Sequence, residues 1–193
     1  PNLVIAAPSD ENECRQMLYT SYLHSGPAAV RYPRGSGPGA IIAKEFTSLD
    51  IGKALKLRDG KRVAILNFGT LLPAAIAAAE QMDATVVDMR WVKPLDEQMV
   101  LELARDHEIL VTVEENAVSG GAGAAVGELL SRCELNCPTL NLGLPDNFIE
   151  HGDHSEQLKW VGLDTDGIVN SIRRRLAADW SCEGTVEVVE LKN

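Results

Sequence analysis

Residues 62–92 read RVAILNFGTLLPAAIAAAEQMDATVVDMRWV, and this stretch decides the fold class. Residues 62–68 and 84–92 are apolar and rich in β-branched side chains, so they predict two strands. Residues 71–82 between them are rich in alanine and carry Pro73 in the first turn, which predicts a helix. A strand, a helix and a second strand in this order are typical of a parallel βαβ unit.

The alternation of strand and helix continues along the chain. Residues 53–57 form an earlier strand-like run, and Asp59-Gly60 after it suits a tight hairpin turn into residues 62–68. We therefore predict an α/β fold, with helices on both faces of a mainly parallel sheet and one antiparallel edge strand. The remaining strands are predicted at residues 109–114 and 138–144, and the remaining helices at residues 96–107, 123–133 and 168–178.

The first 50 residues have a different pattern. Residues 9–24 begin with a capping serine followed by acidic residues, which predicts a helix, and residues 28–32 predict a short strand stopped by Pro33. Residues 35–48 are rich in glycine and lack periodicity, which favours a linker. One helix with one or two strands cannot bury both faces of a sheet, so we expect the chain to begin within a domain.

These patterns divide the chain into four parts. Residues 1–36 are predicted to be the end of one α/β domain, residues 37–50 a linker, and residues 51–178 a complete α/β domain. Residues 179–193 form a tail, in which the valine-rich run 186–189 could add an edge strand.

The composition argues against several classes of function. The chain has 28 acidic and 18 basic residues, and its net charge of -10 would repel a polyanion such as DNA. No apolar run is long enough to cross a membrane and the first residues lack a secretory pattern, so we expect a soluble, cytoplasmic protein. Four cysteines are too few for a disulfide framework, and we expect free thiols. Cys133 and Cys137 lack a second pair of zinc ligands.

The most suggestive cluster for ligand binding is Arg31-Tyr32-Pro33-Arg34-Gly35, directly after a predicted strand. Arginine binds phosphate or carboxylate through paired hydrogen bonds. Arg31 and Arg34 would face opposite sides of a straight strand, so both can meet one anion only if Pro33 and Gly35 bend the chain. Arg34, beyond the bend, is the preferred ligand. An equally weighted interpretation gives one arginine an ion pair and leaves the other solvated.

Other polar motifs are interpreted as structural. Residues 120–123, Gly-Gly-Ala-Gly, could hold a phosphate, but Glu114 and Glu115 would oppose it, so we favour close packing of helix against strand. These two glutamates point to opposite faces of a strand and would not share a proton. His151-Gly152-Asp153-His154 favours a solvated or subunit-facing loop over a metal site. No residue is predicted to be catalytic, to bind a cofactor or to ligate a metal.

Eight motifs follow one another in a specific order. They are PSDENE at 8–13, VRYPRG at 30–35, AILNFG at 64–69, VDMRWVKPLD at 87–96, VEEN at 113–116, GGAG at 120–123, NLGLPD at 141–146 and GLD at 162–164. Each recurs in the wider transketolase superfamily, but the ordered set resembles the 1-deoxy-D-xylulose-5-phosphate synthase family over residues 3–176.

The resemblance implies both an architecture and a function. Residues 1–36 would end a pyrimidine-binding domain, and residues 51–178 would be a transketolase C-terminal-type domain. The family condenses pyruvate with glyceraldehyde 3-phosphate, releasing carbon dioxide, and its product feeds isoprenoid and, in many bacteria, thiamine and pyridoxal synthesis. Its members are homodimers that bind thiamine diphosphate and Mg²⁺ through segments absent here. We therefore expect this chain to act with the N-terminal part of the same enzyme and to be inactive alone. The family's ligand for the acceptor phosphate matches Arg34, with Arg31 as a weaker second.

Two alternatives remain open. The β subunit of a 2-oxo-acid dehydrogenase shares the Val-Glu-Glu strand and glycine loop, although the Tyr-Pro-Arg-Gly and Gly-Leu-Pro-Asp runs favour the synthase. A non-catalytic regulatory or assembly module, binding a partner chain through residues 114–123, is compatible with the same fold.

Overall fold

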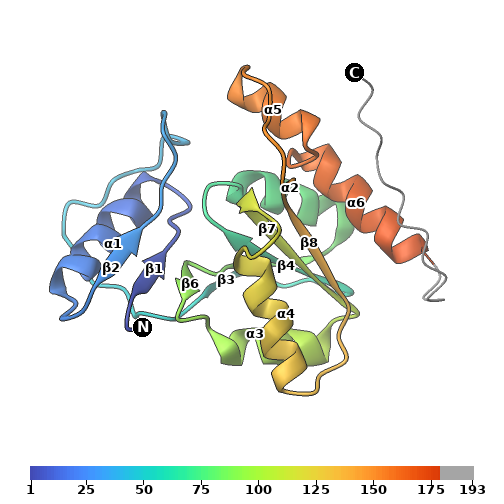
Figure 1. Cartoon of the computed structure of the whole chain (residues 1–193), viewed down its shortest axis with the longest axis horizontal. Helices are drawn as coiled ribbons and strands as arrows, with labels where there is room; N and C mark the ends of the chain where they lie inside the picture. Colours follow the sequence, from blue (N-terminus) through green and yellow to red (C-terminus); the bar gives the residue numbers. More distant parts are fainter. Residues whose placement is uncertain (179–193) are drawn as a thin grey trace.

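The computed structural model describes residues 1–178, which form a small and a large sheet (Figure 1). The small sheet has the order β2-β1-β6. In it, β1 (Val4–Ala6) is parallel to β2 (Ala28–Val30) and antiparallel to β6 (Trp91–Lys93). Helix α1 (Glu11–Leu23) connects β1 to β2 and packs on this sheet.

The large sheet has five strands in the order β3-β5-β4-β7-β8. The edge strand β3 is antiparallel to its neighbour, and the other four strands are parallel. This arrangement confirms the predicted α/β fold with a mainly parallel sheet and one antiparallel edge strand. The strands are β3 (Leu55–Arg58), β4 (Val63–Phe68), β5 (Thr85–Asp88), β7 (Ile109–Ala117) and β8 (Thr139–Leu144).

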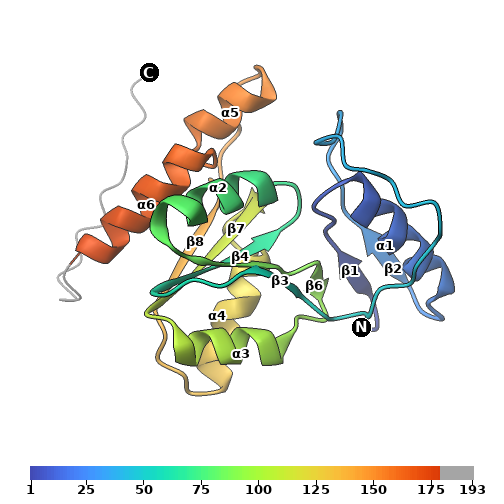
Figure 2. The same cartoon turned by 180° about the vertical axis from the view of Figure 1, so that it is seen from behind.

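Helices cover both faces of the large sheet (Figures 1 and 2). Successive side chains of β4 alternate between two cores: Val63 and Ile65 pack with α2 and α6, whereas Ala64 and Leu66 pack with α3 and α4. Both cores consist mainly of apolar side chains, which explains the long hydrophobic runs of these strands. The helices are α2 (Leu72–Met82), α3 (Glu97–Asp106), α4 (Ala122–Arg132), α5 (His154–Trp160) and α6 (Thr165–Ala177).

The predicted hairpin through Asp59-Gly60 is wrong. A hairpin would pair β3 with β4, but β3 pairs with β5, which lies between β3 and β4 in the sheet. Gly60 does not have a positive φ; its backbone N–H donates to the Thr85 hydroxyl at 2.9 Å, and an added Cβ would collide with the backbone of Ala84. Glycine is therefore needed here because the loop runs close to the backbone of β5. The sequence Asp-Gly does not distinguish this role from that of a hairpin turn.

The single strand predicted over residues 84–92 is also wrong, because the chain breaks at Arg90, whose φ is 59°. β5 ends before this residue in the large sheet, and β6 follows it in the small sheet. Trp91, the first residue of β6, is fully buried against Val4, Ala6 and Met17. Burial on both sides of the break made two strands of different sheets look like one apolar run.

Residues 31–54 contain no helix or strand, but much of this segment is fixed to α1. The Glu11 carboxylate accepts hydrogen bonds from the backbone N–H groups of Gly39 and Ala40, at 2.8 and 3.1 Å. Further along α1, the Thr20 hydroxyl accepts from the backbone N–H of Leu49 at 2.9 Å. Polar side chains of the helix thus take the place of a strand partner for this backbone.

The valine-rich run 186–189, predicted as an edge strand, lies outside the described residues. Within residues 1–178, no helix combines the length and apolar character that a membrane span requires.

Candidate functional site

A small cavity of about 130 Å³ lies between the two sheets, near the carboxyl ends of β1, β2, β4 and β7. Carboxyl ends of parallel strands are the usual place for ligands in α/β proteins. The walls combine apolar rings with charged and hydroxyl groups. The small sheet contributes Pro8, Arg31, Tyr32 and Pro33, and the large sheet contributes Phe68, Gly69, Thr70 and Glu115.

The two predicted arginines occupy different places in this region. Arg31 follows β2 directly, is half-buried and lines the cavity, and its backbone N–H donates to the carbonyl of Ala6 at 2.8 Å. Arg34 is exposed and does not line the cavity. The chain bends at residues 34 and 35, where Gly35 has a φ of 136°, so the bend that a shared anion would require is present. Within residues 1–178, neither guanidinium has an ion-pair partner.

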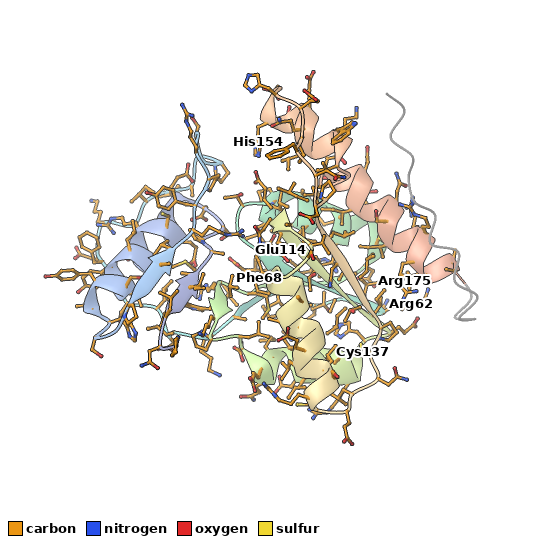
Figure 3. All side chains as sticks on the ribbon, in the orientation of Figure 1. Arg62, Phe68, Glu114, Cys137, His154 and Arg175 are labelled. Carbon is orange, nitrogen blue, oxygen red and sulfur yellow. The ribbon has the colours of Figure 1, made fainter. Side chains whose placement is uncertain are left out.

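Glu115 carries the negative charge of the cavity, and two neighbours fix its carboxylate. Oε1 lies 2.6 Å from Nε2 of His154, the first residue of α5, and Oε2 accepts a hydrogen bond from the Thr70 hydroxyl at 3.4 Å. The Glu115 side chain is 24% exposed and that of His154 59%. Figure 3 shows His154 at the start of α5. The sequence does not predict this pair, because residues 151–154 have the composition of a loop and His154 lies 39 positions from Glu115.

Glu114, the neighbour of Glu115, points to the opposite face of β7, as predicted. Its buried carboxylate accepts hydrogen bonds from the backbone N–H groups of Ala122 and Gly123, at 2.9 and 2.8 Å (Figure 3). These groups form the N-terminus of α4, so the chain itself supplies the anion that this terminus attracts. A Cβ on Gly121 would lie 2.5 Å from a Glu114 oxygen. A Cβ on Gly123 would collide with the Thr112 hydroxyl, so the helix packs closely against the strand at the glycine loop, as preferred from the sequence.

A second polar cluster joins α1 to the end of β5. Arg90 and Glu13 form an ion pair with 2.7 Å between guanidinium nitrogen and carboxylate oxygen, and both side chains are mostly buried. Asp88 nearby is 2% exposed. Burial raises the pKa of Asp88 to about 6, a rise that the Ser9 hydroxyl opposes by its hydrogen bond and the charge of Glu13 assists. These contacts tie the start of α1 to the large sheet.

Asp88 should make the protein less stable as the pH rises. Its pKa is about 6 in the folded state against about 3.8 in the unfolded chain, so the folded state holds the proton more tightly. Its contribution is complete below about pH 4 and is lost as the pH passes 6, a change of about 2–3 kcal/mol. Urea unfolding of the Asp88→Asn variant should lack this part of the pH dependence. The exposed Asp166→Asn variant should keep it, and equal pH profiles for the two would contradict the assignment.

A model of the transketolase C-terminal domain family matches residues 52–168. The chain belongs to this family. It resembles the C-terminal portion of 1-deoxy-D-xylulose-5-phosphate synthases, with 59% identity to the enzyme of Vibrio parahaemolyticus and 57% to that of Photobacterium profundum, each over 177 residues. The match covers 92% of this chain, which spans 28% of the length of these relatives.

Two solved structures have a fold similar to that of this chain. A chain described as "Split gene transketolase, inactive beta4 tetramer" is 30% identical, has a TM-score of 0.81 and aligns over 91% of this chain and 58% of its own length. A transketolase from Campylobacter jejuni is 16% identical, with a TM-score of 0.61 over 90% of this chain and 26% of its own, and supports the fold alone.

Between residues 1 and 178, no group of three or more His, Cys, Asp or Glu side chains is arranged to hold a metal ion. The N-terminus of α4, the helix end that follows the glycine loop, is already occupied by Glu114. Cys14, Cys133 and Cys137 have free thiols, and Cys182 lies beyond the described part.

Proposed function

We propose that this chain is the C-terminal portion of a cytoplasmic synthase that condenses pyruvate with glyceraldehyde 3-phosphate, releases carbon dioxide and forms 1-deoxy-D-xylulose 5-phosphate. The observation that carries the proposal is the 57–59% identity to such synthases over about nine-tenths of the chain. The product would serve isoprenoid, thiamine and pyridoxal synthesis.

The complete enzyme would bind thiamine diphosphate and Mg²⁺ through segments outside these 193 residues. When bound, the thiazolium ring of this cofactor stabilises the carbanion that decarboxylation of pyruvate generates. The residues of this chain contribute positioning, not the carbanion chemistry. Activity is therefore proposed for the chain together with the N-terminal part of the enzyme, in a homodimer, and not for the chain alone.

The contribution of this chain to substrate binding is the phosphate contact. Arg34 stands beyond the bend that follows β2, exposed, with its charge available to a ligand, and Arg31 stands at the base of the same bend. A guanidinium forms two parallel hydrogen bonds with phosphate oxygens, and these bonds are stronger than those between neutral groups. We assign the acceptor phosphate to Arg34, with Arg31 as the second ligand.

In the complete enzyme, Arg34→Ala should raise the KM for glyceraldehyde 3-phosphate by roughly 10–100-fold, because about 1.5–3 kcal/mol of charge-assisted hydrogen bonding is lost. The KM for pyruvate should stay within about twofold, since pyruvate has no phosphate for Arg34 to bind. Steady-state kinetics with each substrate varied in turn measures both effects.

The control is Arg105→Ala, which removes an equal charge from the exposed surface of α3. Its kinetics should match those of the unaltered enzyme. An unchanged KM for glyceraldehyde 3-phosphate in the Arg34 variant would remove the phosphate contact from the proposal.

A further inference from the structure

The cavity between the sheets presents one cation and several hydrogen-bond acceptors. Arg31 provides the positive charge, and no carboxylate in the described part of the chain neutralises it. The Glu115 carboxylate can accept about four hydrogen bonds and receives one from Thr70 and one contact from His154. Two of its acceptor positions are therefore open. The Thr70 hydroxyl, whose proton points to Glu115, can itself accept from a ligand.

The charges make this cavity selective. A bare anion is attracted by Arg31 and repelled by Glu115, since both line a space of about 130 Å³. A ligand that carries hydroxyl groups beside its anionic group satisfies both sides, because each hydroxyl donates to Glu115 or Thr70. The cavity measures only about 130 Å³, so it suits the hydroxyl-bearing part of a small ligand.

We propose that Glu115 and Thr70 recognise the hydroxyl groups of a small phosphorylated polyol or hydroxyaldehyde whose phosphate is held by the arginines after β2. This inference rests on the proposed function, which gives the phosphate contact to the arginines. It adds Glu115 and Thr70 as the residues that distinguish a hydroxylated acceptor from other phosphates. Pro33, which lines the cavity and is exposed, offers an apolar surface against which the carbon chain packs.

His154 acts through Glu115 as a positioning residue. It lies at the start of α5, where Asp153 caps the helix, and its ring nitrogen meets the carboxylate at 2.6 Å. The contact fixes one carboxylate oxygen, so the other oxygen is presented to the cavity. Selectivity for hydroxyl groups therefore depends on Glu115, a residue of β7 in the large sheet, and on His154 of α5.

The experiment compares two ligands that share a phosphate: glycerol 3-phosphate, which has two hydroxyls, and propyl phosphate, which has none. Isothermal titration calorimetry on the full chain should show glycerol 3-phosphate binding roughly tenfold more tightly, the value of one charge-assisted hydrogen bond. Glu115→Met keeps the side-chain length but removes both acceptor oxygens. Its preference should fall below about twofold, and propyl phosphate should bind at least as tightly as before, because the repulsion is gone.

The matched control is Glu156→Met, which removes an equal charge from the exposed surface of α5 and should preserve the tenfold preference. His154→Gln should reduce the preference without weakening propyl phosphate, a result that a purely structural role would not give. Thermal unfolding of each variant verifies folding. An unchanged preference in folded Glu115→Met, or equal binding of both ligands by the unaltered chain, would overturn the inference.

Failure of this inference can be separated from failure of the proposed function. The hydroxyl preference is a ratio measured by binding, whereas the Arg34 contact is tested by the KM of the complete enzyme. A normal Arg34 effect with no hydroxyl preference would reject the role of Glu115 alone. A hydroxyl preference with no Arg34 effect would reject the assigned phosphate ligand and leave the hydroxyl site in place.

Discussion

Replacing Glu114 by alanine should lower the free energy of unfolding by about 3–5 kcal/mol. The carboxylate is 1% exposed and accepts the backbone N–H groups of Ala122 and Gly123. Its removal leaves two buried donors without a partner, each at a cost of about 1–3 kcal/mol, and leaves a void between β7 and α4. Urea unfolding followed by circular dichroism measures the loss.

Two further variants test this explanation. Glu114→Gln keeps one acceptor oxygen at the N-terminus of α4 and should lose about half as much stability as the alanine variant. Glu128→Ala changes an exposed glutamate of the same helix and should stay within about 0.5 kcal/mol of the unaltered chain. A loss below about 1 kcal/mol in Glu114→Ala would show that water replaces the carboxylate at the helix end.

Trp91→Ala should have an effect of similar size, about 3–5 kcal/mol, but confined to the small sheet. The indole is 0% exposed and packs with Val4, Ala6 and Met17 from β1 and α1. With the indole gone, β1 and β6 keep a short antiparallel pairing and little apolar contact. The small sheet and α1 should then unfold at a lower urea concentration than the large sheet.

Hydrogen exchange measured residue by residue distinguishes this result from general destabilisation. Amides of β1 and α1 should exchange faster in Trp91→Ala, whereas those of β4 and β7 should keep their protection. Trp160→Ala is the control, since this tryptophan is 59% exposed on α5 and should cost less than about 1 kcal/mol. Uniformly faster exchange throughout the Trp91 variant would contradict a local role.

The alternation of strand-like and helix-like segments over residues 62–144 was sufficient to predict the parallel strands and their helices. The reason is that strands buried on both faces need continuous apolar runs. Strand order was not predictable in the same way. The loop at Gly60 carries a hairpin signal, yet its conformation is set by contact with Ala84 and Thr85, which lie about 25 positions later. Arg90 is a non-glycine residue with a left-handed conformation, and nothing in its local sequence announces one.

The candidate site was predicted in part. The arginine cluster could be located because strand ends and arginine chemistry are local signals. Glu115 stands beside Glu114 in the sequence, but its partner His154 lies 39 positions away on another element, α5. The helix capped by Asp153 was missed because only seven residues form it, too few for a periodic pattern.

In sequence, β6 lies after residue 50, among the elements of the large sheet. Its hydrogen bonds, however, join it to β1 in the small sheet, whose other strands come from the first 30 residues. A break within residues 37–50 would therefore leave two polypeptides with complementary open edges, β1 on one and β6 on the other. Pairing of these edges, with Trp91 as the buried anchor, favours reassembly of the two products over association with unrelated chains. A gene divided at this point would encode two subunits that recognise each other through the pairing of β1 with β6.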